Sequence, residues 1–447
     1  MFFLRLEPIP IFALSIVASF YSRLGKSLAT LTVLLVSIAC TPAATATPTA
    51  TTPPAPTALP EPVTITFWYA LSGNAGEVFQ SMVDEFNAVN PYGITVEASF
   101  SGEYYETAIK VIDGLENGDL PNGGMIPAGP LWTCHEGDYQ IETYINGREG
   151  LDVADFWPVL WDYNSSGGHI CSLPFNNSTA VLYYNQDLMA AAGLDPNAPP
   201  DTWDELYAMS SQIGASDEDV WGVSTSSPDW WLKALILQNG GQIMNEDASA
   251  PAFASPAGYG ALEFWKRLLD DGLMPAGKYG EARDLFITGQ LGFLVDSTGK
   301  IGQVKDGAQF HWGTAFLPKQ EKHGATVGGA ALVMFPSNPA HEQATWRLLK
   351  WLVSPENSVA WTVSTGYVPT RLSALGSDTI QQLLVDEPVY RAGFEQLSVA
   401  SSYPHFWGMG TLDVLLREAI QQVELGAATP RAALDQAAAL LMEEMGE

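Results

Sequence analysis

The fold is decided by the stretch VTITFWYALSGNAGEVFQSMVDEFNAVNPYGITVEASF, residues 63–100. Residues 63–70 are rich in β-branched and aromatic side chains, which predicts a strand. After a turn at Gly73, apolar residues recur on one helical face, so a helix is predicted that ends at Pro91. A second strand over residues 92–100 and a second helix after it complete the pattern. Strand, helix, strand and helix in this order predict βαβ units with a mostly parallel sheet.

The rest of the chain repeats this style of alternating elements. Strands are predicted over residues 179–185, 290–296 and 328–335, with helices between and after them. The C-terminal part predicts two further helices, residues 411–426 and 429–445, with a glycine between them. Because 447 residues are too many for one ordinary core, the simplest architecture is α/β with two lobes and a helical tail.

The charge balance excludes some classes of partner. The chain has 20 Lys and Arg against 50 Asp and Glu, a formal net charge of −30. Nucleic-acid binding needs cations to neutralise phosphates, so no nucleic-acid partner is expected. The acid excess is interpreted as a solvated surface, and an anionic ligand would need a dedicated local site.

Residues 1–40 are predicted to be a signal peptide with a lipobox-like end. The apolar run 27–39 has the length of a signal-peptide core and is short for a membrane span. It ends directly before Cys40, which would be lipidated and would anchor the protein outside the cytoplasm. Ser37 stands where Leu, Val or Ile is usual, so a plain secreted protein is the alternative. Residues 41–62 are mostly Ala, Thr and Pro and predict an extended linker.

The two remaining cysteines, Cys134 and Cys171, form an even pair. Outside the cytosol a disulfide between them could persist, and two unpaired thiols are the alternative. The sequence alone does not say whether they lie close enough to bond.

Motifs of catalysis are absent from the sequence. It contains no HExxH helix, no Cys-x-x-Cys and no Gly-x-Ser-x-Gly elbow, and no cofactor is called for. The segment DSTGK, residues 296–300, has the wrong glycine spacing for a phosphate loop and is interpreted as a turn after a strand. No local pattern singles out a carboxylate pair of the glycosidase kind.

Aromatic and small polar residues gather instead at the ends of predicted strands, where ligands of open α/β sheets bind. Flat aromatic faces with amide and hydroxyl groups suit a polyhydroxylated ligand, although core packing is the alternative for each aromatic alone. The residues in these clusters include Trp68, Tyr104, Tyr105, Asn176, Asn177, Ser178, Trp230, Trp231, Ser297, Gly329 and Tyr367.

Several stretches resemble the extracellular solute-binding proteins of ABC importers, family 1, and within it the sn-glycerol-3-phosphate-binding subgroup. They are ITFWYALSGNAGEVFQSMVDEFNAVNP, LPFNNSTAVLYYNQDLMAAAGLDPNAPPDTWDEL, VGGAALVMF, SPENSVAWTVSTGYVPTRLSAL and GAATPRAALDQAAALL. The resemblance runs from about Val63 to the C-terminus. It implies a two-lobed periplasmic-binding-protein fold of type II, with lobes that close on a ligand about a hinge. Lobe I is expected over 63–177 and 298–328, and lobe II over 178–297 and 329–447.

The resemblance also implies ligand-binding residues. The matching positions are Tyr104 with its neighbour Tyr105, Ser178, Trp230 with Trp231, Ser297, Gly329 and Tyr367. Two positions depart from the subgroup: its glutamate falls near Ala128 and its phosphate-binding arginine near Asp413. A phosphate in a closed cleft favours a bidentate arginine, so a neutral sugar or polyol is expected, with Asp413 accepting hydroxyl protons. Arg417 could substitute for that arginine or pair with Asp413, and a glycerol-phosphate ligand is the alternative.

The sequence therefore predicts the substrate-binding component of an ABC importer, which delivers a sugar, polyol or glycerol-phosphate type of solute to permease subunits. A secreted glycoside hydrolase and a sensor subunit for a membrane kinase are the competing hypotheses. The hydrolase would need two carboxylates flanking the cleft, and the sensor would share every feature of the receptor.

Overall fold

The computed structural model describes residues 61–127, 132–134, 140–216, 219–402 and 409–446. Cys40, the predicted signal peptide, Ala128 and most of the predicted linker lie outside these residues. Within the described part, no helix has the length and apolar character needed to cross a membrane. The same residues contain no group of His, Cys, Asp and Glu side chains that could hold a metal ion.

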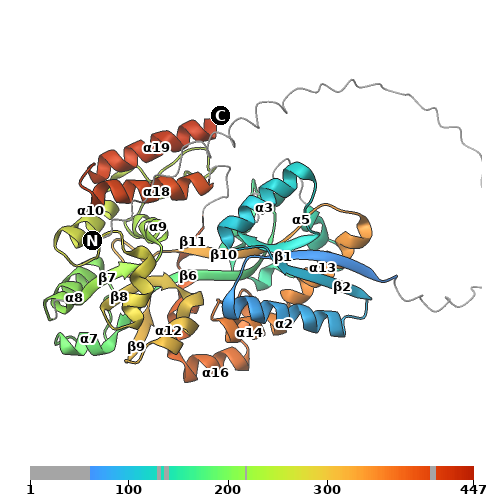
Figure 1. Ribbon diagram of the computed structural model, residues 1–447, viewed down its shortest axis with the longest axis horizontal. Helices are drawn as coiled ribbons and strands as arrows, with labels where there is room; N and C mark the ends of the chain where they lie inside the picture. The colour runs from blue at the N-terminus through green and yellow to red at the C-terminus, as the bar shows by residue number, and fades with distance from the viewer. Residues whose placement is uncertain (1–60, 128–131, 135–139, 217–218, 403–408, 447) are drawn as a thin grey trace, which may run out of the picture. The chain divides into compact units, whose positions relative to one another are not determined.

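Strands and helices alternate along the described chain (Figure 1). The strands are β1 Val63–Tyr69, β2 Ile94–Phe100, β3 Gly123–Pro127, β4 Ser165–Ser166, β5 His169–Ile170, β6 Leu173–Asn185, β7 Trp221–Thr225, β8 Leu291–Ser297, β9 Trp312–Ala315, β10 Ala325–Met334 and β11 Ala400–Ser401. The α-helices are α2 Gly73–Val89, α3 Tyr104–Asn117, α5 Gln140–Ile145, α6 Pro158–Tyr163, α7 Gln186–Ala191, α8 Trp203–Ser216, α9 Pro228–Gln238, α10 Pro256–Asp270, α11 Ala282–Ile287, α12 Ile301–Gly307, α13 Pro339–Leu352, α14 Pro355–Thr365, α15 Leu372–Leu375, α16 Asp378–Asp386, α17 Arg391–Gln396, α18 Met409–Glu424 and α19 Pro430–Gly446. Short 3-10 helices are η4 Val153–Asp155, η5 Tyr279–Glu281, η6 Thr298–Lys300 and η7 Pro388–Tyr390.

Most strands join one sheet with the order β2-β1-β3-β10-β6-β8-β7, to which β9 and β11 add at β6 and β10. β1 pairs in parallel with β2 and β3, and β7 pairs in parallel with β8. β10 is antiparallel to β3 and β6, and β6 is antiparallel to β8. The predicted α/β class is confirmed. The sheet is mixed rather than mostly parallel, because β6 and β10 pair antiparallel with their neighbours.

The long strand β6 belongs to both halves of the sheet. Its residues 173–179 pair with β10, whereas residues 180–185 pair with β8 and β9. Nearly all of β6 is buried, as is typical of a central strand that is covered on both faces. Its partners change between Thr179 and Ala180, two residues after the expected lobe boundary between residues 177 and 178.

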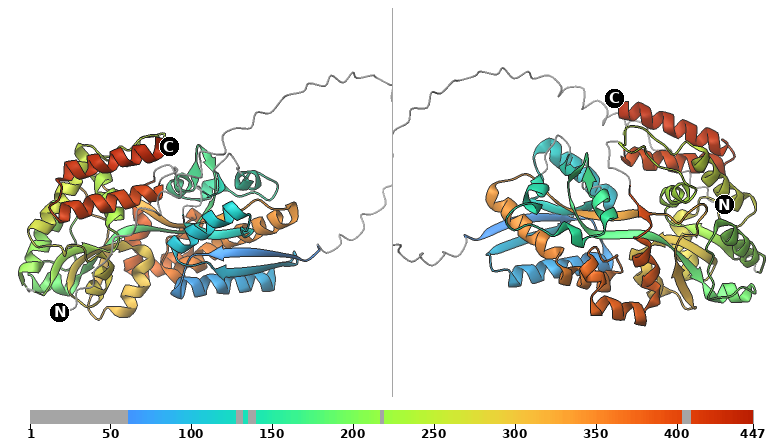
Figure 2. Two further views of the ribbon diagram at one scale, coloured as in Figure 1. Left: turned by 45° about the horizontal axis from the view of Figure 1, so that its top comes forward. Right: turned by 180° about the vertical axis from the view of Figure 1, so that it is seen from behind.

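The first hydrophobic core lies around β1, β3 and the adjoining half of β10. Phe67 of β1 stacks on Phe79 of α2 with ring centroids 5.7 Å apart. Trp346 of α13 and Trp361 of α14 are fully buried in the same core. Helix α3 packs against β3 with a separate cluster that includes Ile126. Figures 1 and 2 show these helices around the blue and cyan strands.

The second core lies around β7, β8 and the C-terminal half of β6. Helices α8, α9, α10, α18 and α19 contribute to it, with Trp231 and Trp265 at its centre. The C-terminal helices α18 and α19 lie side by side and pack with α9 and α10 (Figures 1 and 2).

These cores give a different division of the chain from the predicted boundaries. Residues 329–447 were expected in lobe II, yet α13 and α14 pack on β1 and α2 in the first core. The apolar faces of these helices decide this, because Trp346 and Trp361 are buried there. The packing therefore favours placing residues 330–367 with lobe I.

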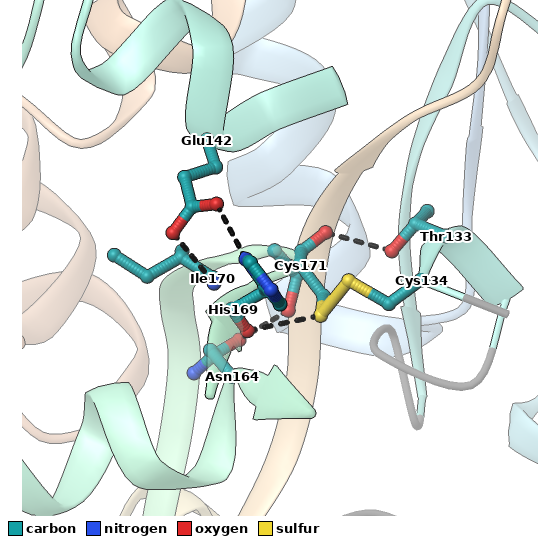
Figure 3. The surroundings of a disulfide bond; sticks show 8 residues. Thr133, Cys134, Glu142, Asn164, His169, Ile170 and Cys171 are labelled. Atoms are coloured by element: carbon teal, nitrogen blue, oxygen red, sulfur yellow. Dashed lines mark hydrogen bonds and ion pairs between the residues drawn. A yellow bond between two sulfur atoms is a disulfide. The ribbon is translucent and has the colours of Figure 1, made fainter. Parts of the chain in front are cut away.

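Cys134 and Cys171 are joined by a disulfide, and their Cα atoms lie 5.5 Å apart (Figure 3). Thr133 Oγ1 donates a hydrogen bond to the carbonyl of Cys171 at 2.7 Å. Beside it, His169 Nδ1 lies 2.9 Å from a carboxylate oxygen of Glu142. The bond ties the segment after β3 to the start of β6. A closed loop of this kind stabilises a fold mainly by restricting the unfolded chain.

Candidate functional site

Three polar side chains from separate elements meet where β6 passes between the cores. Tyr104 begins α3, Asn176 lies near the start of β6, and Tyr367 follows α14. Asn176 Nδ2 donates to the Tyr104 hydroxyl at 3.1 Å, and the Tyr367 hydroxyl lies close enough to both side chains for them to influence its pKa. The structure therefore brings together two of the three predicted tyrosines, Tyr104 and Tyr367, with an asparagine beside them.

Much of this cluster is shielded from water, since Asn176 is fully buried and Tyr367 is 9% exposed, whereas Tyr104 is half-buried. Burial raises the pKa of Tyr104 well above its usual value and also raises the pKa of Tyr367. Both phenols therefore stay neutral at physiological pH and can donate or accept hydrogen bonds. The buried amide oxygens of Asn176 and Asn177 accept no hydrogen bond from any residue that the structure describes. Buried acceptors without a donor are rare and call for an explanation such as a missing ligand or water.

Gly329 of β10 lies against this part of β6. Its φ is +114°, and a Cβ atom there would come within 1.9 Å of the Asn176 carbonyl oxygen. Only glycine fits such a conformation and such a close approach. The Tyr163 hydroxyl donates to the Gly329 carbonyl at 3.1 Å. Gly329 therefore allows β10 to approach β6 closely beside Asn176, because it has no side chain.

Trp230 comes from the other core and lies over the neighbouring glycine of β10. A Cβ atom on Gly328 would be 3.0 Å from the Trp230 ring, so the ring rests on this backbone. The indole Nε1 is buried and donates to none of the described residues. An aromatic face with a free donor is the type of group that binds polyhydroxylated ligands.

The two predicted serines flank the same region. Ser178 is buried in β6 opposite Gly328 of β10. Ser297 ends β8, and its hydroxyl accepts a hydrogen bond from the Gly299 amide at 3.2 Å. The Tyr183 hydroxyl donates to the Ser297 carbonyl at 2.6 Å. Ser297 thus shapes the turn that follows β8.

Three other predicted residues lie outside this cluster. Trp231 is only 1% exposed and packs in the second core, with its ring 4.9 Å from that of Trp265. The Tyr105 side chain is 76% exposed. Trp68 packs on the face of β1 that α3 covers, beside Ile126.

Asp413 takes part in a network of alternating charges between α9 and α18. Lys233 Nζ donates to Asp413 at 2.7 Å and lies 3.6 Å from Asp229. Arg417 Nε donates to the other oxygen of Asp229 at 2.7 Å. Lys233 is only 4% exposed, so its charge needs these carboxylates. The network holds α18 on α9, next to Trp230.

A cavity of about 400 Å³ opens at the first turn of α2, lined in part by Tyr69, Ser72 and Phe100. The Ser72 hydroxyl donates to Glu103, the residue before Tyr104. Tyr104, Asn176 and Tyr367 are not among the residues that line this cavity, and the hydrogen bond of Ser72 is its link to the start of α3. A cavity of this size accommodates a small ligand or part of one.

Some residues of the region escaped prediction. Glu103, Tyr163 and Lys300 have no motif of their own, because their partners lie far away in the sequence. Only Lys300 had a signal, since it ends the DSTGK segment interpreted as a turn. That segment is indeed a turn after β8, formed by η6.

A strand that runs through two α/β cores, with aromatic and amide groups gathered at the passage, defines the class of two-lobed binding proteins of type II. The chain belongs to the bacterial extracellular solute-binding proteins, whose family model matches residues 81–384. This membership confirms the predicted family and fold, and it implies an extracytoplasmic location.

Curated relatives and solved structures agree with this membership. The sn-glycerol-3-phosphate-binding periplasmic protein UgpB of Escherichia coli (strain K12) is 26% identical over 406 residues, which cover 84% of this chain and 90% of the relative. The cyclic alpha-maltosyl-1,6-maltose binding protein from Arthrobacter globiformis has a TM-score of 0.75 at 25% identity, covering 86% of this chain and 99% of that one. UgpB from Mycobacterium tuberculosis in complex with glycerophosphocholine has a TM-score of 0.75 at 21% identity, covering 86% and 98%.

Proposed function

We propose that this protein is the substrate-binding component of an ABC importer and that it closes on a sugar, polyol or glycerol-phosphate type of solute. The observation that carries the proposal is the meeting of Tyr104, Asn176 and Tyr367 at the passage of β6, with Trp230 across from them. The ligand site of the proposal is this cluster together with the Trp230 ring.

The chemistry of the cluster fits a ligand with several hydroxyl groups. Neutral phenols donate and accept hydrogen bonds, and the free amide oxygens of Asn176 and Asn177 can accept hydroxyl protons. The Trp230 ring offers an apolar face to the CH groups of a sugar. The names of the relatives support a sugar as well as a glycerol-phosphate ligand, since they include a protein that binds a maltose derivative and one that binds glycerol 3-phosphate.

The relatives are binding proteins rather than enzymes, and the proposal includes no catalytic step. Permease subunits are the proposed partners that receive the solute. The proposal keeps Cys40 as a lipid anchor and residues 41–62 as the linker that lets the lobes reorient near the membrane. Lobe I would comprise the first core and lobe II the second.

The proposal is tested by a thermal-shift screen of the full chain with maltose, glycerol, glycerol 3-phosphate and glycerophosphocholine. A ligand at about 100 times its Kd adds about 2.7 kcal/mol to stability, which gives a clear shift. Tyr104→Phe and Tyr105→Phe form a matched pair on one helix, because only Tyr104 is in the cluster. Tyr104→Phe should weaken binding by about twofold to tenfold, and Tyr105→Phe should leave it unchanged. Equal affinities in both variants would exclude the cluster, and turnover of a glycoside would support the hydrolase.

A further inference from the structure

Lys300 lies at the edge of the tyrosine cluster. It is the last residue of η6 and directly precedes α12. The residue before it, Gly299, touches the Tyr367 ring so closely that an added Cβ atom would be 2.8 Å from Cζ. Lys300 is also close enough to Glu103, the residue before Tyr104, for their charges to interact. The lysine therefore lies between the end of β8 and the start of α3.

The nearby carboxylate Asp296 is already satisfied by other groups. Its oxygens accept from Arg283 Nε, from the Ser226 hydroxyl and from the Ser297 amide, each at 2.7 Å. Two cations, Arg283 and Lys300, thus surround one buried carboxylate at the end of β8. Arg283 pairs directly with Asp296, and Glu103 is a second carboxylate close to Lys300, so the two cations and two carboxylates balance in charge.

Lys300 itself makes no hydrogen bond or ion pair with a residue that the structure describes. It is half-buried, and this burial, followed by the repulsion from Arg283, lowers its pKa. A partly desolvated ammonium group without an acceptor is unfavourable. An acceptor supplied by a bound molecule would remove this cost. Lys300 is therefore placed to bind a group that arrives with the ligand.

We infer that Lys300 is a specificity-determining residue that selects ligands with an anionic group, of the phosphate or carboxylate type. This inference rests on the proposed function and narrows its ligand class. Lysine binds phosphate oxygens as a compact point charge with three donors. Glu103 faces the same place and would repel the anion, so its charge limits the affinity that Lys300 provides.

The inference is tested by calorimetric titration of the full chain with glycerol 3-phosphate, glycerophosphocholine and maltose at one ionic strength. Lys300→Met removes the charge and keeps the length of the side chain. Lys305→Met is the matched control, because Lys305 lies on α12, is half-exposed and pairs with Glu387 instead. Glu103→Gln removes the opposing charge.

Lys300→Met should weaken binding of the phosphate-bearing ligand by about tenfold to a hundredfold and change maltose binding less than twofold. Lys305→Met should change neither, and Glu103→Gln should strengthen binding of glycerol 3-phosphate. The two phosphate ligands separate a terminal phosphate from a diester.

Two outcomes would overturn the inference and leave the proposed function intact. The first is binding of maltose alone by the unchanged chain. The second is an equal loss of affinity for charged and neutral ligands in both Lys300→Met and Glu103→Gln. That result would mean that Lys300 and Glu103 together hold α3 against η6 and have no role in ligand selection. If no member of the panel binds, the proposed function fails and the inference with it.

Discussion

Alanine substitutions at the adjacent residues Trp230 and Trp231 should separate an effect on ligand affinity from an effect on stability. Both belong to α9, and both were expected to touch the ligand. Trp231 is 1% exposed and packs on Trp265, whereas Trp230 lies over Gly328 with its Nε1 unpaired among the described residues. Replacing each by alanine should therefore affect two different measurements.

The magnitudes follow from burial. Removing a fully buried tryptophan costs about 3–5 kcal/mol, so Trp231→Ala should lower the free energy of unfolding by about that amount. Trp230 is only partly buried, and Trp230→Ala should cost about 1–2 kcal/mol of stability. Loss of its ring from the ligand site should weaken binding by about tenfold, which corresponds to about 1.4 kcal/mol.

Urea unfolding followed by far-UV circular dichroism measures stability without relying on tryptophan fluorescence. Titration calorimetry with the ligand found in the screen measures affinity below the unfolding transition. Weakened binding by Trp231→Ala at unchanged stability would refute this assignment. Unchanged affinity in Trp230→Ala would do the same.

Three further predictions concern the stability of the fold. Gly329→Ala should lower stability by about 1–3 kcal/mol and impair ligand binding, because φ is +114° and the new Cβ would collide with the backbone of Asn176. Urea unfolding measures the loss of stability, and calorimetry measures the loss of affinity. Burial alone would raise the pKa of Asp155, but hydrogen bonds from Ser373 and Arg371 outweigh it and lower this pKa. The ionised carboxylate therefore stabilises the fold above about pH 4, and this stabilisation is lost as pH falls through the lowered pKa. Asp155→Asn should thus cost about 2 kcal/mol at pH 7 and less at pH 3 in urea unfolding. Burial raises the pKa of Glu424 because it disfavours the ionised carboxylate, so stability falls as pH rises and this group loses its proton. Glu424→Gln, which stays neutral, should therefore be more stable than the unchanged chain at pH 7.

Each of these predictions has a clear contrary result. Normal stability in Gly329→Ala would mean that the backbone there can relax. A loss in Asp155→Asn that is the same at pH 3 and pH 7 would exclude the ionised carboxylate as its source. Equal stability of Glu424→Gln and the unchanged chain at every pH would show that burial of Glu424 is without cost.

Periodicity predicted the elements well where one face is apolar. The helix ending before Pro91 and the two C-terminal helices correspond to α2, α18 and α19. The start of β6 was missed, because Asn176 and Asn177 resemble a turn when met in sequence. In the fold they lie inside a buried strand, where Tyr104 and Gly328 on neighbouring elements accept hydrogen bonds from their amide nitrogens.

The site was only partly predictable for a related reason. Tyr104 and Tyr367 were expected from the resemblance, and they do meet in the structure. Helical spacing could not separate Trp230 from Trp231, since residues one apart on a helix face different directions and only tertiary packing decides which is core. Asp413 was expected to be open to ligand, but a lysine on another helix pairs with it.

The sharing of β6 has a consequence for how the protein opens and unfolds. Because its two ends are paired in different halves of the sheet, neither core can lose β6 without exposing the edge of the other. The described halves should therefore behave as one cooperative unit in native-state hydrogen exchange, with the amides of β6 among the slowest. For the proposed closure on a ligand, we expect β6 to bend while it keeps these hydrogen bonds to both halves.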